Sequence, residues 1–173
     1  MTALGAWRLL LLAWAAFLML VGPAHAQTTE RPATTTARAL AVACGPGHGY
    51  LAPIVERESR RQLLHPVLVV ALMRVESHCR RDAKSHKGAR GYLQLLGVAR
   101  GGYRGAELLE PDTNIRLGCR WLASMSTWCG SLRRGLGAFN TGKCDRGAGF
   151  ARRVLAREAW IWGEMRKRKE PRT

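Results

Sequence analysis

The chain has 173 residues, and its 28 Lys and Arg residues against 12 Asp and Glu residues give a formal net charge of +16. This length fits one domain with a single modest core. Such a charge favours polyanionic partners, although a general preference for Arg would produce the same excess. The sequence has neither a Cys-x-x-Cys pair nor a His-rich run, so we expect no metal and no other cofactor.

Residues 1–26 have the pattern of a secretory signal peptide. Arg8 precedes an apolar run over residues 9–21, and residues 24–26 have the small-x-small form of a cleavage site. An uncleaved membrane anchor is the alternative, but the run is shorter than the roughly 20 residues that a spanning helix needs. We therefore expect an exported protein of the periplasm or cell envelope. There the positive charge favours an anionic cell-envelope surface, and not nucleic acid, as the partner.

Composition divides the rest of the chain into three parts. Residues 27–43 are rich in Thr and Ala and lack aromatic residues, so they predict a flexible lead-in. The domain is expected over residues 44–165. Residues 166–173 form a basic tail that could hold the protein on an anionic wall or membrane.

The first helices of the domain are predicted from apolar spacing and from proline. Residues 51–64 have mixed helical spacing, which predicts an amphipathic helix. After His65-Pro66, residues 67–75 form an almost unbroken apolar run. A strand would explain this run, but its length and its helix-forming residues favour a helix that is buried on most of its circumference and ends at Glu76.

Four further helical segments are expected. They are a short one over residues 91–99, a longer one capped by Asp112 or Thr113, a third over residues 132–139, and a last one from about residue 148. Sustained strand alternation is absent from the sequence. The predicted fold class is therefore mainly α.

Glu76 is the candidate acid of this sequence. It lies at the carboxyl end of the buried helix, where the helix dipole and apolar neighbours both disfavour a negative charge. A carboxyl group with a raised pKa can act as a general acid near neutral pH. A solvated charge at a helix end is the alternative interpretation.

Four motifs follow in a fixed order. They read Glu76-Ser77-His78-Cys79 with Ala83-Lys84-Ser85-His86-Lys87-Gly88-Ala89-Arg90-Gly91-Tyr92-Leu93-Gln94, then Asn114-Ile115-Arg116-Leu117-Gly118-Cys119-Arg120-Trp121-Leu122, then Ala138-Phe139-Asn140-Thr141-Gly142, and last Phe150-Ala151-Arg152-Arg153-Val154. Over about residues 51–155 they resemble the signature of the soluble lytic transglycosylase family, which belongs to the lysozyme-like superfamily. The resemblance implies a single lysozyme-like helical domain.

The resemblance also implies an activity on peptidoglycan. Family members cleave the β-1,4 bond between N-acetylmuramic acid and N-acetylglucosamine, and one glutamate serves as acid and then as base, so that a 1,6-anhydro end forms without water. Ordinary glycosidases instead use two carboxylates. Asp82, Glu107, Glu110 and Asp112 are the nearby acidic residues, and the family gives none of them this role.

Carried over position by position, the resemblance makes Glu76 the acid/base. Ser85, Gln94 and Asn140 would bind the sugar or hold the site. Gly88, with the other motif glycines, would allow close backbone approach. Each of these polar residues taken alone could also be ordinary surface.

The sequence departs from the family signature at two positions. Cys79 replaces an aromatic residue, and Phe139 replaces a tyrosine whose hydroxyl is expected near the catalytic acid. Tyr92 or Tyr103 could supply that hydroxyl. The departure at Phe139 therefore concerns the mechanism and not the fold.

All five cysteines lie beyond the predicted cleavage site, where an oxidising compartment would let them pair. A Cys129–Cys144 bond would close a short loop around the segment with Asn140, and we favour it. Cys79 with Cys119, Cys44 with either, or free cysteines in the core remain open.

Three alternatives to a transglycosylase follow from the same residues. A non-catalytic wall-binding module would keep the cleft and lose turnover through Phe139. A hydrolysing lysozyme of the same fold would end the reaction with water, and a basic membrane-active protein would act through its charge. The expected form is a monomer that acts on peptidoglycan glycan strands, either alone or for a secretion or conjugation complex.

Overall fold

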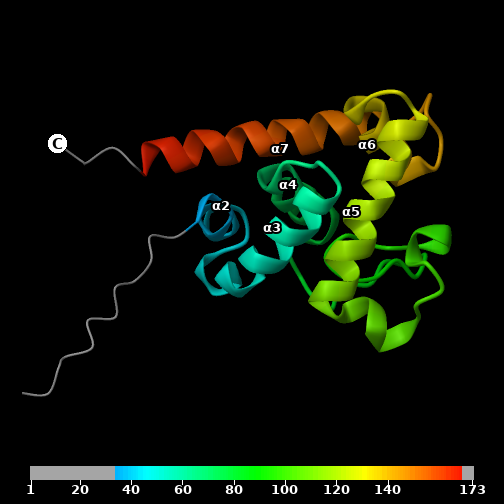
Figure 1. Cartoon of the computed structure of the whole chain (residues 1–173), viewed down its shortest axis with the longest axis horizontal. Coiled ribbons are helices and arrows are strands. Elements are labelled where there is room, and N and C mark those ends of the chain that lie inside the picture. The colour runs from blue at the N-terminus through cyan, green and yellow to red at the C-terminus, as the bar shows by residue number, and fades with distance from the viewer. Residues whose placement is uncertain (1–33, 169–173) are drawn as a thin grey trace, which may run out of the picture. The chain divides into compact units, whose positions relative to one another are not determined.

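The computed structural model describes residues 34–168 (Figure 1). The elements of this part are, in order, α2 (Thr35–Ala43), η1 (Pro46–Leu51), α3 (Ala52–Arg61), α4 (Pro66–Ser77), η2 (Gly97–Arg100), η3 (Gly105–Leu109), α5 (Pro111–Trp128), α6 (Leu132–Thr141) and α7 (Ala148–Lys167), where η marks a short 3₁₀-helix. Residues 34–168 form no β-strand, which confirms the predicted mainly α fold. Within the same range, no helix combines the length and apolar character needed to cross a membrane. The predicted signal peptide over residues 1–26 lies outside the described residues.

Helix α4 supplies much of the core. It begins at Pro66, and the His65 side chain accepts a hydrogen bond from Val67 N at 3.2 Å, which satisfies a free N–H group of the first turn. Every residue from 67 to 73 is buried, because α2, α3 and α7 all pack against this helix. Full burial of one such aliphatic side chain contributes about 1.5–3 kcal/mol. The helix ends where His78 takes a left-handed conformation, with φ 56°. The predicted buried helix is confirmed.

The domain begins earlier than the sequence indicates. The prediction of a flexible lead-in over residues 27–43 is wrong for its second part, because α2 forms there and its Ala39 and Leu40 side chains are fully buried in the main core. The Thr34 hydroxyl caps the helix by accepting a hydrogen bond from Ala37 N at 3.1 Å. Short Ala and Thr side chains gave no amphipathic pattern, yet they let α2 pack closely on α4 and α7.

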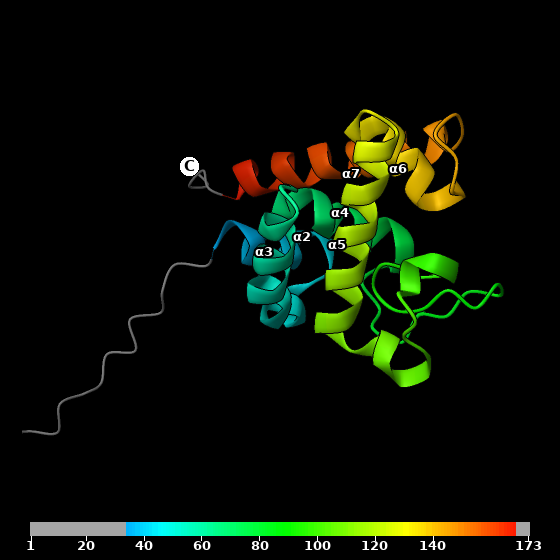
Figure 2. The same cartoon turned by 45° about the vertical axis from the view of Figure 1, so that its right-hand side comes forward.

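In the second half of the domain, α7 packs against α4, and α6 packs against both α5 and α7. In Figures 1 and 2, α7 runs along one side of the domain and α5 runs across it, with α6 beside the end of α5. The segment of residues 79–110 lies along the first half of α5. Gly118 permits this packing, because a Cβ atom there would collide with the Leu93 side chain.

Two local predictions in this half are wrong. Residues 91–99 do not form one helix, because Arg90 pairs with Leu95 in an isolated antiparallel bridge and η2 begins only after it. Helix α5 begins at Pro111 and is not capped by Asp112 or Thr113. The Asp112 carboxylate instead forms an ion pair with Arg57. The fixed φ of proline at the first helical position starts this helix without a side-chain cap.

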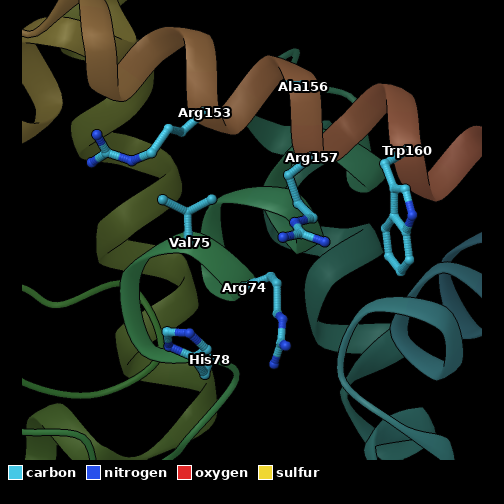
Figure 3. A pocket seen from close by; sticks show the side chains of 7 residues that line it. All are labelled: Arg74, Val75, His78, Arg153, Ala156, Arg157 and Trp160. Carbon is cyan, nitrogen blue, oxygen red and sulfur yellow. The ribbon is translucent and has the colours of Figure 1, made fainter.

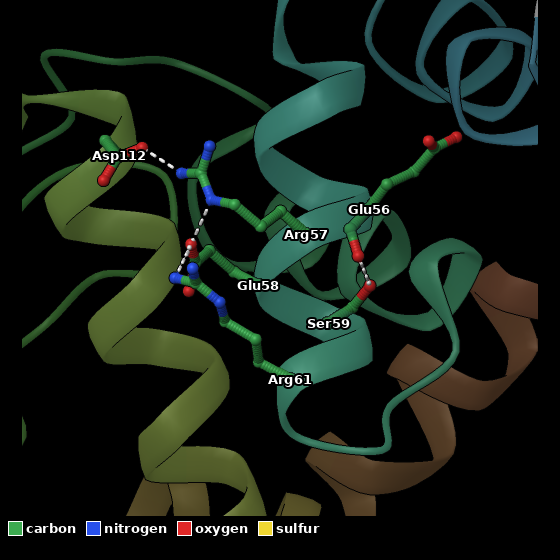
Figure 4. A network of polar contacts seen from close by, with 6 residues as sticks. All are labelled: Glu56, Arg57, Glu58, Ser59, Arg61 and Asp112. Atoms are coloured by element: carbon green, nitrogen blue, oxygen red, sulfur yellow. Dashed lines mark hydrogen bonds and ion pairs between the residues drawn. The ribbon is translucent and has the colours of Figure 1, made fainter.

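A polar network joins α3 to α5 (Figure 4). The Glu58 carboxylate is 2% exposed and lies 2.6 Å from Arg57 Nε and 3.0 Å from an Arg61 guanidinium nitrogen. Arg57 also reaches Asp112 on α5. Since a buried carboxylate without a partner is costly, this pairing lets the interface between α3 and α5 contain a charge.

Two disulfides form in the described residues. Cys129 bonds to Cys144, as predicted, and closes the loop that contains α6. Cys44 bonds to Cys79, one of the pairings left open, and ties the end of α2 to the end of α4. Cys119 is a free, buried thiol, so the alternative pairing of Cys79 with Cys119 is wrong.

The end of the chain also differs from the predicted boundary. The predicted domain ends at residue 165, whereas α7 continues as a regular helix through Lys167. The first two residues of the predicted basic tail are therefore helical. Residues 169–173 lie outside the described part.

Candidate active site

Glu76 lies on the last turn of α4 and lines an open pocket of about 520 Å³. The residues that share this pocket come from α4, the segment after it, α5 and α6: Glu76, Ser85, His86, Lys87, Ala89, Gln94, Leu95, Leu96, Gly97, Val98, Ala99, Trp121, Phe139, Asn140 and Gly142. Of the predicted site residues, the fold brings together Glu76, Ser85, Gln94 and Asn140. It does not bring Gly88 or Tyr92 to the pocket.

Burial raises the pKa of Glu76 from its ordinary value of 4.5 to about 7. The positive charge of Arg153 on α7 acts in the opposite direction and lowers this pKa, but burial has the larger effect. A carboxyl group with this pKa is about half protonated at neutral pH, so it can give up a proton and take one back. This is the property that an acid/base residue needs.

Ser77 fixes the end of α4 next to Glu76. Its hydroxyl oxygen lies 3.1 Å from Met73 O and 2.9 Å from Tyr92 O, and it donates its one proton to these carbonyl groups. The side chain is 2% exposed. The hydroxyl therefore joins the helix that carries the acid to the loop that forms one wall of the pocket.

Asn114, to which the motifs assign no role, holds the same loop from α5. Its Oδ1 accepts a hydrogen bond from Leu93 N at 2.8 Å, and its Nδ2 donates to Leu108 O at 2.7 Å and to Arg90 O at 3.0 Å. Gly91 makes room for this amide, since a Cβ atom there would collide with Asn114 and the backbone φ is +76°. The spacing of the second motif contained this residue, but only the fold shows what it contacts.

Ser85 and Gln94 line the pocket and also maintain its wall. Ser85 Oγ accepts a hydrogen bond from Ala89 N at 3.0 Å. Gln94 Nε2 donates to Ala83 O at 3.1 Å and to Gly91 O at 2.9 Å. Ser85 Oγ and Gln94 Nε2 thus form hydrogen bonds within the protein, whereas the side-chain oxygen of Gln94 remains available for a ligand.

The expectation for Tyr92 needs correction. Its side chain is 1% exposed, and its hydroxyl lies 2.8 Å from the Tyr50 hydroxyl. Tyr103, the other proposed source of a hydroxyl, lies 3.4 Å from an Arg116 nitrogen. Neither tyrosine lines the pocket. The hydroxyl that is missing at Phe139 is therefore not supplied by either of them.

The opposite wall of the pocket comes from the end of α6. Phe139 packs parallel to Phe150 of α7, with ring centroids 6.5 Å apart, and its carbonyl accepts a hydrogen bond from Trp121 Nε1 at 3.4 Å. Asn140 follows and is exposed in the pocket. Trp121 of α5 lines the pocket as well. Aromatic and amide groups of this kind can pack on a sugar ring and bind its polar substituents.

Glu76 is the only carboxylate among the pocket residues of the described part. The other candidates are held elsewhere: Glu110 pairs with Arg81, Asp112 pairs with Arg57, and the Glu107 carboxylate accepts from Arg104 N. Asp82 is exposed and does not line the pocket. Residues 34–168 also contain no group of three or more His, Cys, Asp or Glu side chains placed to bind a metal. Within the described residues, the catalytic pocket therefore contains a single carboxyl group.

A family model described as the transglycosylase SLT domain matches residues 53–154. The chain therefore belongs to the transglycosylase SLT domain family, as the motifs predicted, and with it to the lysozyme-like proteins. Among solved structures it is similar to the 70 kDa soluble lytic transglycosylase of Escherichia coli, with 23% sequence identity, a TM-score of 0.49, and coverage of 73% of this chain and 23% of that chain. No curated protein matches the chain.

Proposed function

We propose that the protein is a peptidoglycan lytic transglycosylase that uses Glu76 as its single acid/base. One observation carries the proposal: Glu76 stands alone among the pocket residues as a carboxylate, and burial brings its pKa to about 7. The family whose model matches the chain acts on peptidoglycan, which supports the substrate class.

In the proposed reaction, protonated Glu76 gives its proton to the glycosidic oxygen as the bond from that oxygen to C1 of N-acetylmuramic acid breaks. The 6-hydroxyl of the same sugar then bonds to C1, and the Glu76 carboxylate takes the hydroxyl proton. The products are a free 4-hydroxyl on N-acetylglucosamine and a 1,6-anhydro end, and Glu76 returns to its starting state. The reaction consumes no water and needs no second carboxylate, in accord with a pocket that contains one acid.

The remaining pocket residues have positioning roles in this proposal. The exposed amide of Asn140 and the free oxygen of Gln94 face the space where a sugar would bind, and they suit its hydroxyl and acetamido groups. Ser77 and Asn114 keep the helix and the loop in register, so the proton of Glu76 is held in one place. Correct placement of a proton donor is worth several orders of magnitude in rate.

A wall-binding module with little turnover is the second candidate, and Phe139 is the observation that favours it. No tyrosine hydroxyl replaces the one that the motif predicts at this position, since Tyr92 and Tyr103 do not line the pocket. The exported location, the monomeric state and service to a secretion or conjugation complex are parts of the proposal that rest on the sequence and the family.

The proposal is tested by the release of soluble muropeptides from purified sacculi by the disulfide-bonded protein. Glu76→Gln should abolish release, because glutamine cannot donate or accept the proton. Glu56→Gln is the matched control, since Glu56 lies on α3 outside the pocket, and it should keep full activity. Release that is equal in the wild-type protein and in Glu76→Gln would contradict the proposal, whereas binding without release by the wild-type protein would support the wall-binding module.

A further inference from the structure

A second pocket, of about 540 Å³, lies between α4 and α7 and contains a cluster of positive charge (Figure 3). Arg74 and His78 line it from α4, and Arg153, Arg157 and Trp160 line it from α7. Figure 3 shows Arg157 extending from α7 toward Arg74, and Trp160 closes one end. Among the described residues, none of those that line this pocket is acidic.

The arginines of this pocket form no ion pair within the described residues. In residues 34–168, every ion pair lies elsewhere, and neither Arg74, Arg153 nor Arg157 forms a side-chain hydrogen bond with a carboxylate. The guanidinium carbon of Arg157 lies 4.9 Å from the centre of the Trp160 ring, which holds that cation in the pocket. Like charges that share one pocket repel each other, so an anion bound there would gain a strong attraction.

This pocket adjoins the active site through two connections. Val75 lines the basic pocket and the next residue, Glu76, lines the catalytic pocket. Arg153 lies over the ring of Phe150, at 5.5 Å from its centre, and Phe150 packs on Phe139 of the catalytic pocket. The two pockets are therefore neighbours along α4, and Arg153 of the basic pocket is close enough to Glu76 for its charge to lower the pKa of that acid.

We propose that the basic pocket binds the carboxylate groups of the peptide attached to N-acetylmuramic acid next to the cleaved bond. This inference rests on the proposed function. The sugars of a peptidyl glycan strand are uncharged, so the negative charge near the cleaved bond belongs to the peptide. Arginine side chains match the planar, two-oxygen shape of a carboxylate, and the half-exposed Trp160 ring offers an apolar surface to the peptide stem.

Occupation of the pocket has a consequence for Glu76. Arg153 lowers the pKa of Glu76 in the free protein. A peptide carboxylate beside Arg153 offsets that charge, so the pKa of Glu76 rises when substrate binds and more of the acid is protonated. Binding of the peptide thus prepares the group that cleaves the glycan.

The test compares three substrates: soluble strands with intact peptides, strands whose peptide carboxylates have been converted to amides, and strands freed of peptide. The double variant Arg74→Gln/Arg157→Gln should lose about tenfold in kcat/KM on intact strands, the size expected from charged hydrogen bonds. It should equal the wild-type protein on the other two substrates. The matched control Arg133→Gln/Arg152→Gln removes the same charge from exposed positions outside the pocket and should behave as wild type throughout.

The same preference should be visible without catalysis. The free peptide, titrated calorimetrically, should bind to Glu76→Gln and lose that binding when Arg74 and Arg157 are replaced in addition. The inference would be overturned if the double variant lost kcat/KM equally on all three substrates, or if the wild-type kcat/KM stayed the same after the peptide was removed. It would also be overturned if inorganic phosphate bound as tightly as the peptide. Absence of cleavage by the wild-type protein, with peptide binding retained, would overturn the proposed function and leave the peptide site supported.

Discussion

The Arg153 guanidinium on α7 lowers the pKa of the Glu76 carboxyl group on α4, but burial of Glu76 has the larger effect and raises that pKa to about 7. The protein thus holds an acid whose charged form is disfavoured, and this has a cost in stability.

The first prediction concerns stability and pH. Below pH 4.5 the Glu76 carboxyl is neutral in the folded and unfolded states, and between pH 4.5 and about 7 it ionises only in the unfolded state. The free energy of unfolding should therefore fall as pH rises through this window. Glu76→Gln, which stays neutral, should match the wild-type protein below pH 4.5 and be more stable above pH 7. Urea unfolding at both ends of the window measures this, and a difference that is independent of pH would refute it.

The second prediction concerns the pH dependence of cleavage. The rate should decline as pH rises above about 7, because the protonated acid is lost. Arg153→Gln removes the charge that lowers the pKa, so its declining limb should move to higher pH. The neighbouring exposed Arg152→Gln should leave the limb in place. Profiles of kcat/KM against pH for the three proteins test this prediction. It would be contradicted if the decline of kcat/KM in Arg153→Gln stayed at the wild-type pH or moved to lower pH.

Phe139→Tyr restores a hydroxyl to the wall of the catalytic pocket. A hydrogen bond to a charged group contributes about 1.5–3 kcal/mol, so kcat should rise by about tenfold or more. Phe150→Tyr adds the same group to the ring that packs beside it and outside the pocket, and should give no gain. Initial rates on sacculi measure both variants. An unchanged or lower kcat in a folded Phe139→Tyr protein would show that this hydroxyl is not needed here.

Asn114→Ala should damage both stability and activity. The change leaves Leu93 N and the carbonyl groups of Arg90 and Leu108 without their buried partner. Each unsatisfied buried group costs about 1–3 kcal/mol, so the free energy of unfolding should fall by at least about 3 kcal/mol. Ser126→Ala on the same helix removes one hydrogen bond within α5 and serves as the comparison. A loss of less than about 1 kcal/mol for Asn114→Ala would contradict the bracing role.

The sequence predicted the part of the fold that depends on local pattern. The apolar run after Pro66 predicted α4. The position of Glu76 at the end of that helix predicted an acid with a raised pKa. Cys129 and Cys144 were paired correctly because the segment between them is short. Helix α2 was missed, because its small residues carry no amphipathic signal and only the core that they enter holds them in place.

Contacts between segments that are far apart in the chain could not be predicted from the sequence. The hydroxyl of Tyr92 turns toward Tyr50 instead of the pocket, a direction that its motif does not encode. Trp121 and Asn114 belong to one motif, but the first lines the pocket and the second braces the loop. The basic pocket arises where α4 and α7 meet, and their residues are far apart in the chain.

We propose that Glu76 alone serves as acid and base, so that the sugar's own hydroxyl and not water completes the reaction. Cleavage of sacculi in water enriched in ¹⁸O tests it most directly, with the new glycan ends identified by mass spectrometry. Transglycosylation by Glu76 should give 1,6-anhydro ends that contain no ¹⁸O and are absent with Glu76→Gln. Reducing ends that carry ¹⁸O at C1 would contradict it and identify a hydrolase on the same fold.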